Sequence, residues 1–193
     1  MDLSWLPRKR PLAATALALA GLCGPLEAAM PWSGTKAVLL HARDGQATQI
    51  ATVQFEPRSD GRIGFRLVTD TSRFKDFFLS MKEFKCLEGG GEVMCHVPYP
   101  YPQPGTITPS DLAWLEHSLL FLFKKPGEFG AKLWNGLYFR LEAKGDGLEG
   151  TPQAIDLNLI SAPPDRPALP PYRPALRDDI APGSRWFQRL TIE

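Results

Sequence analysis

The sequence predicts an α+β domain that consists mainly of antiparallel sheet, with one or two helices packed on it, one hairpin disulfide and a proline-rich C-terminal segment. Three observations support this fold class. Several segments alternate apolar and polar residues, which is the period of a strand with one buried face. Clusters of glycine, proline, serine and aspartate separate them as turns. Two cysteines flank a run of three glycines, as expected of a cross-linked hairpin.

The N-terminus has the layout of a secretory signal peptide. A basic cluster, Arg8 to Arg10, precedes an apolar run of twelve residues from Pro11 to Leu22, which is too short to span a bilayer comfortably. Small residues follow, and we expect cleavage after Ala28. Retention as an anchor is one alternative. Lipidation of Cys23 is another, disfavoured because a leucine precedes it where a small residue is expected.

The charge balance argues against nucleic acid as a partner. The chain has 22 basic and 21 acidic residues, and removing residues 1–28, with three basic and two acidic residues, leaves 19 of each. A chain without net charge lacks the positive surface that would attract nucleic acids or anionic membranes. The length suits one domain, for which we expect residues 29–161, followed by a segment at 162–193 that wraps it. We expect no transmembrane span after signal cleavage.

Five segments are predicted as strands, namely residues 36–41, 49–56, 62–69, 133–144 and 154–160. The last four alternate apolar and polar residues, so that each directs one face to the core and the other to solvent. A five-residue turn at 57–61 joins the second strand to the third. Gly145-Asp146-Gly147 turns the chain between the fourth and the fifth.

A short helix is predicted over residues 74–81. Phe74, Phe77, Phe78 and Met81 stand at positions i, i+3, i+4 and i+7, which places them on one helical face. Phe77, Leu79 and Met81 also suit a strand, so this alternative stays open.

The two cysteines that remain after signal cleavage predict a disulfide. If Gly90-Gly91 forms a two-residue hairpin turn, Glu88 faces Val93 and Cys86 faces Cys95. The cysteines then occupy a non-hydrogen-bonded pair, in which side chains approach most closely. An oxidising compartment favours the bond.

Other roles for these cysteines are disfavoured. A redox pair uses a Cys-x-x-Cys spacing, whereas eight residues separate Cys86 from Cys95. A zinc site needs four ligands, and His96 lies on the opposite strand face. A haem attachment motif would lack its first cysteine. Scattered methionines are more typical of a core than of a copper site. We therefore expect no metal and no cofactor.

A longer helix is predicted from Thr108 to about Phe123. Thr108 suits the N-cap position, Pro109 the first helical position, and lysines follow the C-terminal end. Leucines form one apolar stripe along it.

The opposite side of this predicted helix carries the candidate binding residues. Trp114, His117 and Phe121 lie together there, and Tyr99 and Tyr101 precede them in an extended segment of alternating prolines. Two interpretations remain open. Either the proline segment or the C-terminal tail covers this face, or the aromatic residues form a groove for an envelope protein, a peptide or a glycan.

The C-terminal part is rich in proline from Ala162 to Pro182 and has no periodicity. Trp186, Phe187, Leu190 and Ile192 follow, which predicts an end that docks on the domain.

Four stretches, LSMKEFKCLE, CHVPYPYP, LLFLFKKP and LWNGLYFRL, resemble segments of an uncharacterised family of secreted bacterial proteins. They cover roughly residues 70 to 165. The resemblance implies export, and it carries over no site residue because no activity is attached to that family.

The sequence contains no recognisable catalytic motif: it has no nucleophile elbow, no H-E-x-x-H, no Walker loop and no dinucleotide-binding glycine pattern. We therefore expect a non-enzymatic binding or accessory protein of the periplasm. The alternative is a small cell-envelope hydrolase whose site the sequence does not locate.

Overall fold

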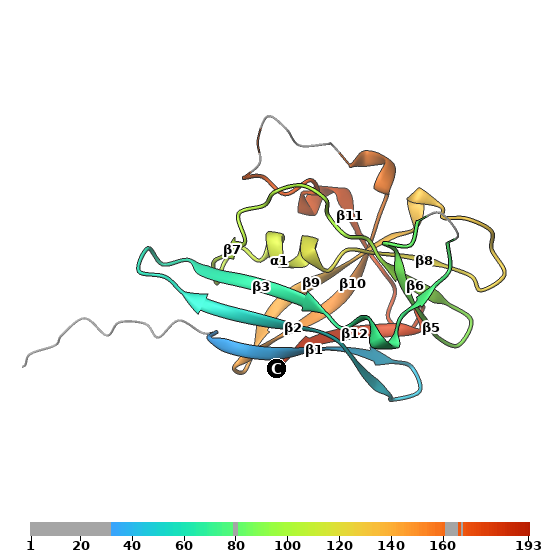
Figure 1. Cartoon of the computed structure of the whole chain (residues 1–193), viewed down its shortest axis with the longest axis horizontal. Coiled ribbons are helices and arrows are strands. Elements are labelled where there is room, and N and C mark those ends of the chain that lie inside the picture. Colours follow the sequence, from blue (N-terminus) through green and yellow to red (C-terminus); the bar gives the residue numbers. More distant parts are fainter. Residues whose placement is uncertain (1–31, 79–80, 161–165, 167) are drawn as a thin grey trace, which may run out of the picture.

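Figure 1 shows the computed structural model, which describes residues 32–78, 81–160, 166 and 168–193. These residues form one twelve-stranded sheet in which every paired strand is antiparallel. The mainly antiparallel fold predicted from the sequence is thus confirmed. The predicted signal peptide, with Cys23, and most of the segment 161–167 lie outside the described residues.

The strand order in the sheet is β4-β5-β6-β8-β9-β10-β12-β1-β2-β3-β7, and β11 also pairs with β10. The strands are β1 (Gly34–Ala42), β2 (Ala47–Pro57), β3 (Ile63–Thr69), β4 (Lys75–Asp76), β5 (Lys85–Glu88), β6 (Val93–His96), β7 (Thr106–Ile107), β8 (Phe121–Lys124), β9 (Gly136–Lys144), β10 (Gly147–Ile155), β11 (Arg177–Asp179) and β12 (Phe187–Ile192). The described helices are α1 (Ala113–Ser118) and the 3-10 turns η1 (Thr71–Arg73), η2 (Leu133–Asn135), η3 (Leu157–Leu159) and η4 (Pro174–Leu176).

The sheet curls around a core because α1 packs against two strands that are distant in the strand order. One is β7, at the end of the sheet, and the other is β9, near its middle. Leu115 and Leu119 of the helix segment are buried among apolar side chains of the first two strands, β9 and β12. Figure 1 shows α1 lying over β9 and β10 beside β3 and β7. Burial of these leucines supplies the hydrophobic stabilisation that closes the fold.

The N-terminal strands agree with their prediction to within two residues at each end. On β2, Ala51, Val53 and Phe55 are buried, as the alternation predicts. The pairing of β2 with β3 places Phe55 opposite Phe65. Local periodicity is thus sufficient to identify β2 and β3.

The fifth predicted strand is misplaced. β10 starts at Gly147, the last residue of the predicted turn, and pairs with β9 along its whole length. The predicted strand is wrong beyond Ile155, because the Asp156 carboxylate accepts a hydrogen bond from the Asn158 N–H (2.8 Å) and turns the chain into η3. Pro152 of β10 falls between the end of the β12 pairing and the start of the β11 pairing, where a missing N–H is tolerated.

The helix predicted from Thr108 to Phe123 is also wrong at both ends. Only six residues, Ala113–Ser118, form α1, and its N-terminus at Leu112 has no side-chain cap. Thr108 instead forms a bridge with Asp111. Beyond the helix the chain becomes β8, which pairs with β6 on one side and β9 on the other. An apolar run without a solvent-exposed face suits a strand that is buried on both sides. The pairing with β6 and β9 therefore outweighs the helical spacing of its leucines.

No helix forms in the described part of the segment 74–81. Residues 71–73 make a 3-10 turn capped by Asp70, and Lys75–Asp76 pair with β5 as the short edge strand β4. Phe78 is buried against Phe84, with ring centroids 5.9 Å apart. Residues 79 and 80 lie outside the described residues. Phe77 and Met81 lie outside β4, so neither the helix nor the strand through these residues is found in the described part of the segment.

The hairpin disulfide is confirmed with its predicted register. Cys86 lies opposite Cys95, with Cα atoms 3.9 Å apart and the two sulfurs bonded, and Glu88 lies opposite Val93. The Gly89 N–H donates to the Glu92 carbonyl (2.7 Å), so the turn is the predicted two-residue one. In the chain-entropy account, closing so short a loop stabilises the fold by about 2–3 kcal/mol.

The C-terminal strand belongs to the interior of the sheet. We predicted that the segment 162–193 wraps the domain and that its last residues dock on it. Residues Phe187–Ile192 in fact form β12, which pairs with β1 on one side and β10 on the other, and Leu190 and Ile192 are fully buried. The chain end thus completes the sheet instead of lying on its surface.

Candidate functional site: a basic cleft

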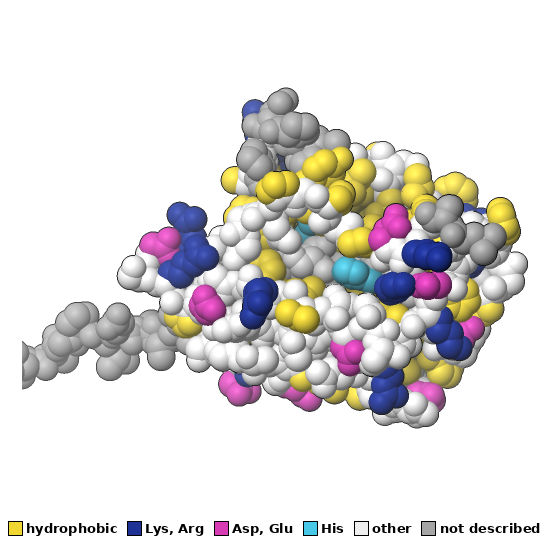
Figure 2. Space-filling model, viewed as in Figure 1, with side chains coloured by type: hydrophobic (Ala, Val, Ile, Leu, Met, Phe, Trp, Pro, Cys, Tyr) yellow, Lys and Arg dark blue, Asp and Glu magenta, His cyan; other side chains and the backbone are white. Residues whose placement is uncertain are grey.

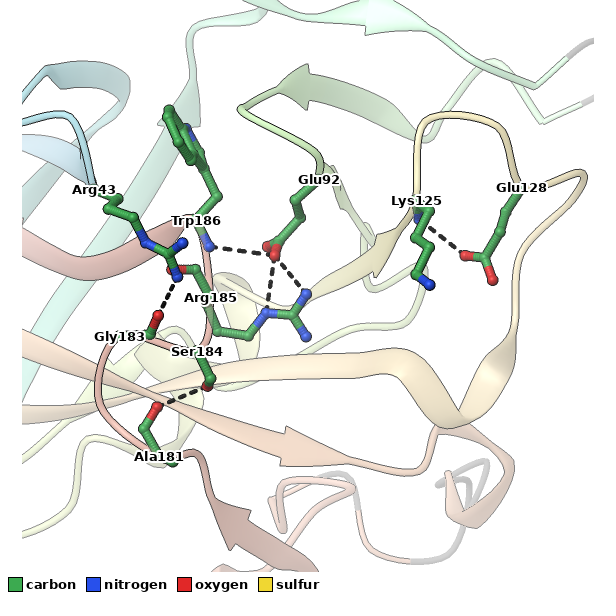
Figure 3. Close-up of polar contacts among 9 residues, drawn as sticks. All are labelled: Arg43, Glu92, Lys125, Glu128, Ala181, Gly183, Ser184, Arg185 and Trp186. Atoms are coloured by element: carbon green, nitrogen blue, oxygen red, sulfur yellow. Dashed lines mark hydrogen bonds and ion pairs between the residues drawn. The ribbon is translucent and has the colours of Figure 1, made fainter.

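Four segments that are distant in the sequence meet around a cleft of about 510 Å³. They are the turn after β1, the tip of the β5–β6 hairpin, the end of β8 with the loop that follows it, and the residues that lead into β12. We call it the basic cleft, because its charged lining residues are Arg43, Lys124, Lys125, Lys132, Arg185, Glu92 and Glu128. Figure 3 shows several of them and the contacts that hold them.

The glycines at the hairpin tip make room for Trp186, another lining residue. A Cβ atom added to Gly89 or Gly90 would overlap the indole ring, so these positions exclude larger residues. Gly91 has a φ of +89°, in the left-handed region that favours glycine, and this closes the turn. The hairpin and the segment before β12 are therefore packed tightly together on one side of the cleft.

Glu92 orients Arg185 in the cleft. Its Oε2 atom accepts hydrogen bonds from Nε and Nη2 of Arg185 at 2.9 and 2.5 Å, and from the N–H of Trp186 at 3.3 Å (Figure 3). The guanidinium carbon lies 3.4 Å from the ring centroid of Phe123. The two charged side chains are largely buried, at 18% and 7% exposure, so their attraction is weakly screened. A carboxylate and an aromatic ring together fix the guanidinium.

Glu128 orders the loop on the other side of the cleft. Its carboxylate accepts hydrogen bonds from the backbone N–H of Lys125 (2.9 Å) and from the ammonium group of Lys132 (2.5 Å). The hydrogen bond from Lys132 is the main reason that the pKa of Glu128 is lowered from its ordinary value. The loop is thus tied at both ends by one ionised side chain.

The cleft keeps an excess of positive charge. Its two carboxylates pair with Arg185 and Lys132. Within the described residues, Arg43, Lys124 and Lys125 have no carboxylate partner. Arg43 donates only to the carbonyl oxygens of Gly183 and Arg185 in the segment before β12. Lys124 is only 5% exposed, and its ammonium lies 5.5 Å from the ring centroid of Phe78. Arg43 and Lys125 are exposed, and two such cations on one concave surface favour an anionic ligand.

The aromatic residues predicted as a binding site are brought together only in part. Tyr99, Trp114 and His117 form one cluster, in which the rings of Tyr99 and His117 lie 4.5 Å apart. Tyr101 packs on Tyr99 and is half exposed. Phe121 lies in β8, not on the helix, and packs in the main core.

This aromatic cluster is covered by the segments on either side of it in sequence. Trp114 and His117 are 6% and 0% exposed. Tyr99 covers them from the proline segment, and Tyr172 covers His117 from the tail. The Trp114 indole N–H donates to the carbonyl of Ala168 (3.1 Å). This arrangement agrees with the first of the two interpretations, in which the proline segment or the C-terminal tail covers the aromatic face.

Beside this aromatic cluster, Glu116 and His117 of α1 belong to a buried polar network. Glu116 accepts hydrogen bonds from Arg177 (2.5 Å) and from the backbone N–H of Leu141 in β9 (2.8 Å). The Arg177 guanidinium carbon lies 4.3 Å from the ring centroid of Tyr138, whose hydroxyl is hydrogen-bonded to Nδ1 of His117. Burial, with a smaller contribution from Arg177, lowers the pKa of His117 to about 4. His117 is therefore neutral near pH 7.

The described residues contain no group of three or more His, Cys, Asp and Glu side chains that is placed to hold a metal ion. None of their helices has the length and the apolar composition needed to cross a membrane.

The basic cleft was not predicted from the sequence, because Lys124 and Lys125 were expected at the end of a helix. A signal was present in the run 124–134, which holds three lysines and two aromatic residues within eleven positions. Arg43 and Arg185 carried no such signal, since only the pairing of β12 with β1 brings them together.

Comparison with known proteins adds no assignment, since no family model, curated protein or solved structure matches this chain.

Proposed function

We propose that this protein is an exported, non-enzymatic binding module of the cell envelope that holds an anionic ligand in the basic cleft. The observation that carries this proposal is the convergence of two exposed cations, Arg43 and Lys125, which have no carboxylate partner among the described residues, beside the fixed guanidinium of Arg185. A guanidinium held in advance loses little conformational entropy when it binds a carboxylate or a phosphate group.

Binding is favoured over hydrolysis by the positions of the three histidines. His41 is hydrogen-bonded to Thr191, and His96 to the carbonyl of Ser118, while His117 is in the buried network. The hydroxyl of Ser184, which lines the cleft, donates to the carbonyl of Ala181. A serine hydrolase needs a base beside its nucleophile, and no histidine lines this cleft.

Export is supported by the layout of residues 1–28 and by the disulfide, which persists in oxidising compartments. We expect the protein recovered from the periplasm to begin near Ala29 and to be two hydrogen atoms lighter than its reduced form. Intact-mass measurement with and without a reductant checks both expectations. A retained Met1, a lipid on Cys23 or two free thiols on Cys86 and Cys95 would contradict them.

Ligand binding is tested with soluble anions. We expect glycerol phosphate and a short oligoglutamate to bind the exported protein in calorimetric titrations, with an affinity that falls as salt is added. Lys125→Gln should weaken binding about fivefold, since a charge pair at about 4 Å in water contributes about 1 kcal/mol. Adding Arg43→Gln should weaken it further.

The matched control is Arg66→Gln, which removes one positive charge from the exposed surface of β3, outside the lining of the cleft. Equal losses for Lys125→Gln and Arg66→Gln would show that only net charge matters, and would refute the cleft as the site.

A further inference from the structure

The loop between β8 and η2 exposes an apolar tip. Phe129 is 100% exposed, and Trp134 and Leu133 are 61% and 48% exposed. In Figure 1 this loop projects from the right-hand end of the molecule, and Figure 2 shows hydrophobic and basic side chains together at that end. Full exposure of a phenylalanine in a soluble domain is unfavourable, and a cluster of such residues is typical of an interaction site.

The exposed tip belongs to an ordered loop. The Glu128 carboxylate accepts the hydrogen bonds from Lys125 and Lys132 that close the loop, and the Glu128 N–H donates to the carbonyl of Lys125 (3.0 Å). Gly130 has a φ of +71°, which allows the chain to turn directly after Phe129. The loop therefore presents the phenylalanine on a closed turn.

The apolar surface continues onto the neighbouring turn. η2, which holds Leu133 and Trp134, packs against η3, where Leu159 is 52% exposed. The tip is thus one part of a wider apolar surface. Such a protruding surface suits insertion into an apolar phase better than it suits a peptide, which needs a groove.

Positive charge flanks the apolar surface. The Lys132 ammonium lies 6.0 Å from the ring centroid of Trp134, and Trp134, Lys125 and Lys132 all line the basic cleft. Protruding aromatic residues beside lysines fit the interface of an anionic bilayer, where the rings enter the headgroup region and the lysines pair with phosphates.

We infer that the loop between β8 and η2, together with η2, docks this protein on an anionic lipid surface. Phe129, Leu133 and Trp134 enter the interface, and the basic cleft receives the phosphate of a lipid headgroup. This inference rests on the proposed anion-binding function of the cleft and names its ligand class.

Co-sedimentation with vesicles tests the inference. We expect the exported protein to sediment with vesicles of equal parts phosphatidylglycerol and phosphatidylcholine, and to stay in solution with phosphatidylcholine alone. Phe129→Ser should weaken partitioning about tenfold, as expected for the loss of one buried aromatic side chain. Lys125→Gln should weaken it about fivefold, the change that corresponds to about 1 kcal/mol per lysine near an anionic surface. Trp134 emission should shift to shorter wavelength, and Trp134→Phe should remove the shift.

Two variants serve as matched controls. Val68→Ser changes an apolar side chain on β3 that is 52% exposed, and Arg66→Gln removes a charge from the same strand. Neither should change partitioning, and all four surface variants, Phe129→Ser, Lys125→Gln, Val68→Ser and Arg66→Gln, should keep the melting temperature of the parent.

The outcomes separate this inference from the proposed function. Binding of glycerol phosphate without vesicle binding would overturn the lipid inference and leave the proposed function intact. Vesicle binding that Phe129→Ser does not weaken would overturn the role of the tip. Absence of binding to both soluble anions and vesicles would overturn both proposals.

Discussion

Replacing Glu116 by alanine is expected to lower the free energy of unfolding by about 3–5 kcal/mol. The Glu116 carboxylate pairs with Arg177, whose side chain is only 2% exposed, and accepts the backbone N–H of Leu141. The substitution leaves a buried guanidinium without its counter-ion and a strand N–H without an acceptor. Desolvation makes both losses costly.

Urea unfolding of the exported protein measures this effect. Glu142→Ala is the matched control, because Glu142 is exposed and pairs with Arg140 at the surface, so its loss should cost less than about 1 kcal/mol. The double variant Glu116→Leu/Arg177→Met should recover much of the loss, since apolar residues can replace a buried ion pair. Equal costs for the two single variants would show that the buried pair contributes no more than a surface pair.

The second large effect concerns pH and His117. Its pKa is about 4 in the folded protein and 6.5 in the reference state, so the unfolded chain binds the proton more readily. The preference of the folded state for the neutral His117 side chain therefore contributes its full stabilisation above pH 6.5. This contribution, roughly 3 kcal/mol, is lost as the pH falls from 6.5 towards 4.

Unfolding titrations between pH 7 and pH 4 check this expectation. His117→Gln should lose less stability over that interval than the parent, although it is less stable at pH 7 because the Tyr138 hydroxyl loses its partner. The pKa of His96 is also lowered, chiefly by burial, so His96→Gln shows how much of the acid sensitivity belongs to that site. A parent and a His117→Gln variant with parallel pH profiles would contradict the assignment.

Local patterns in the sequence were sufficient for the hairpins. The disulfide register follows from the position of Gly90-Gly91 between Cys86 and Cys95, because a two-residue turn determines each pair on both strands. The second and third strands follow from the alternation of apolar and polar residues. In each case, residues close in sequence contact one another, so their spacing carries the information.

The sequence by itself therefore determined the antiparallel character of the fold, the disulfide and the second and third strands. Only the tertiary structure decided that Phe121–Lys124 is a strand, since its partners β6 and β9 come from distant segments. The same holds for the C-terminal strand, which is selected by pairing with β1 and β10. The basic cleft depends on that pairing, because Arg43 and Arg185 meet only when β1 pairs with β12. Long-range strand pairing is stabilised by burial between distant segments, so the residue pattern within one segment does not show which strand it pairs with.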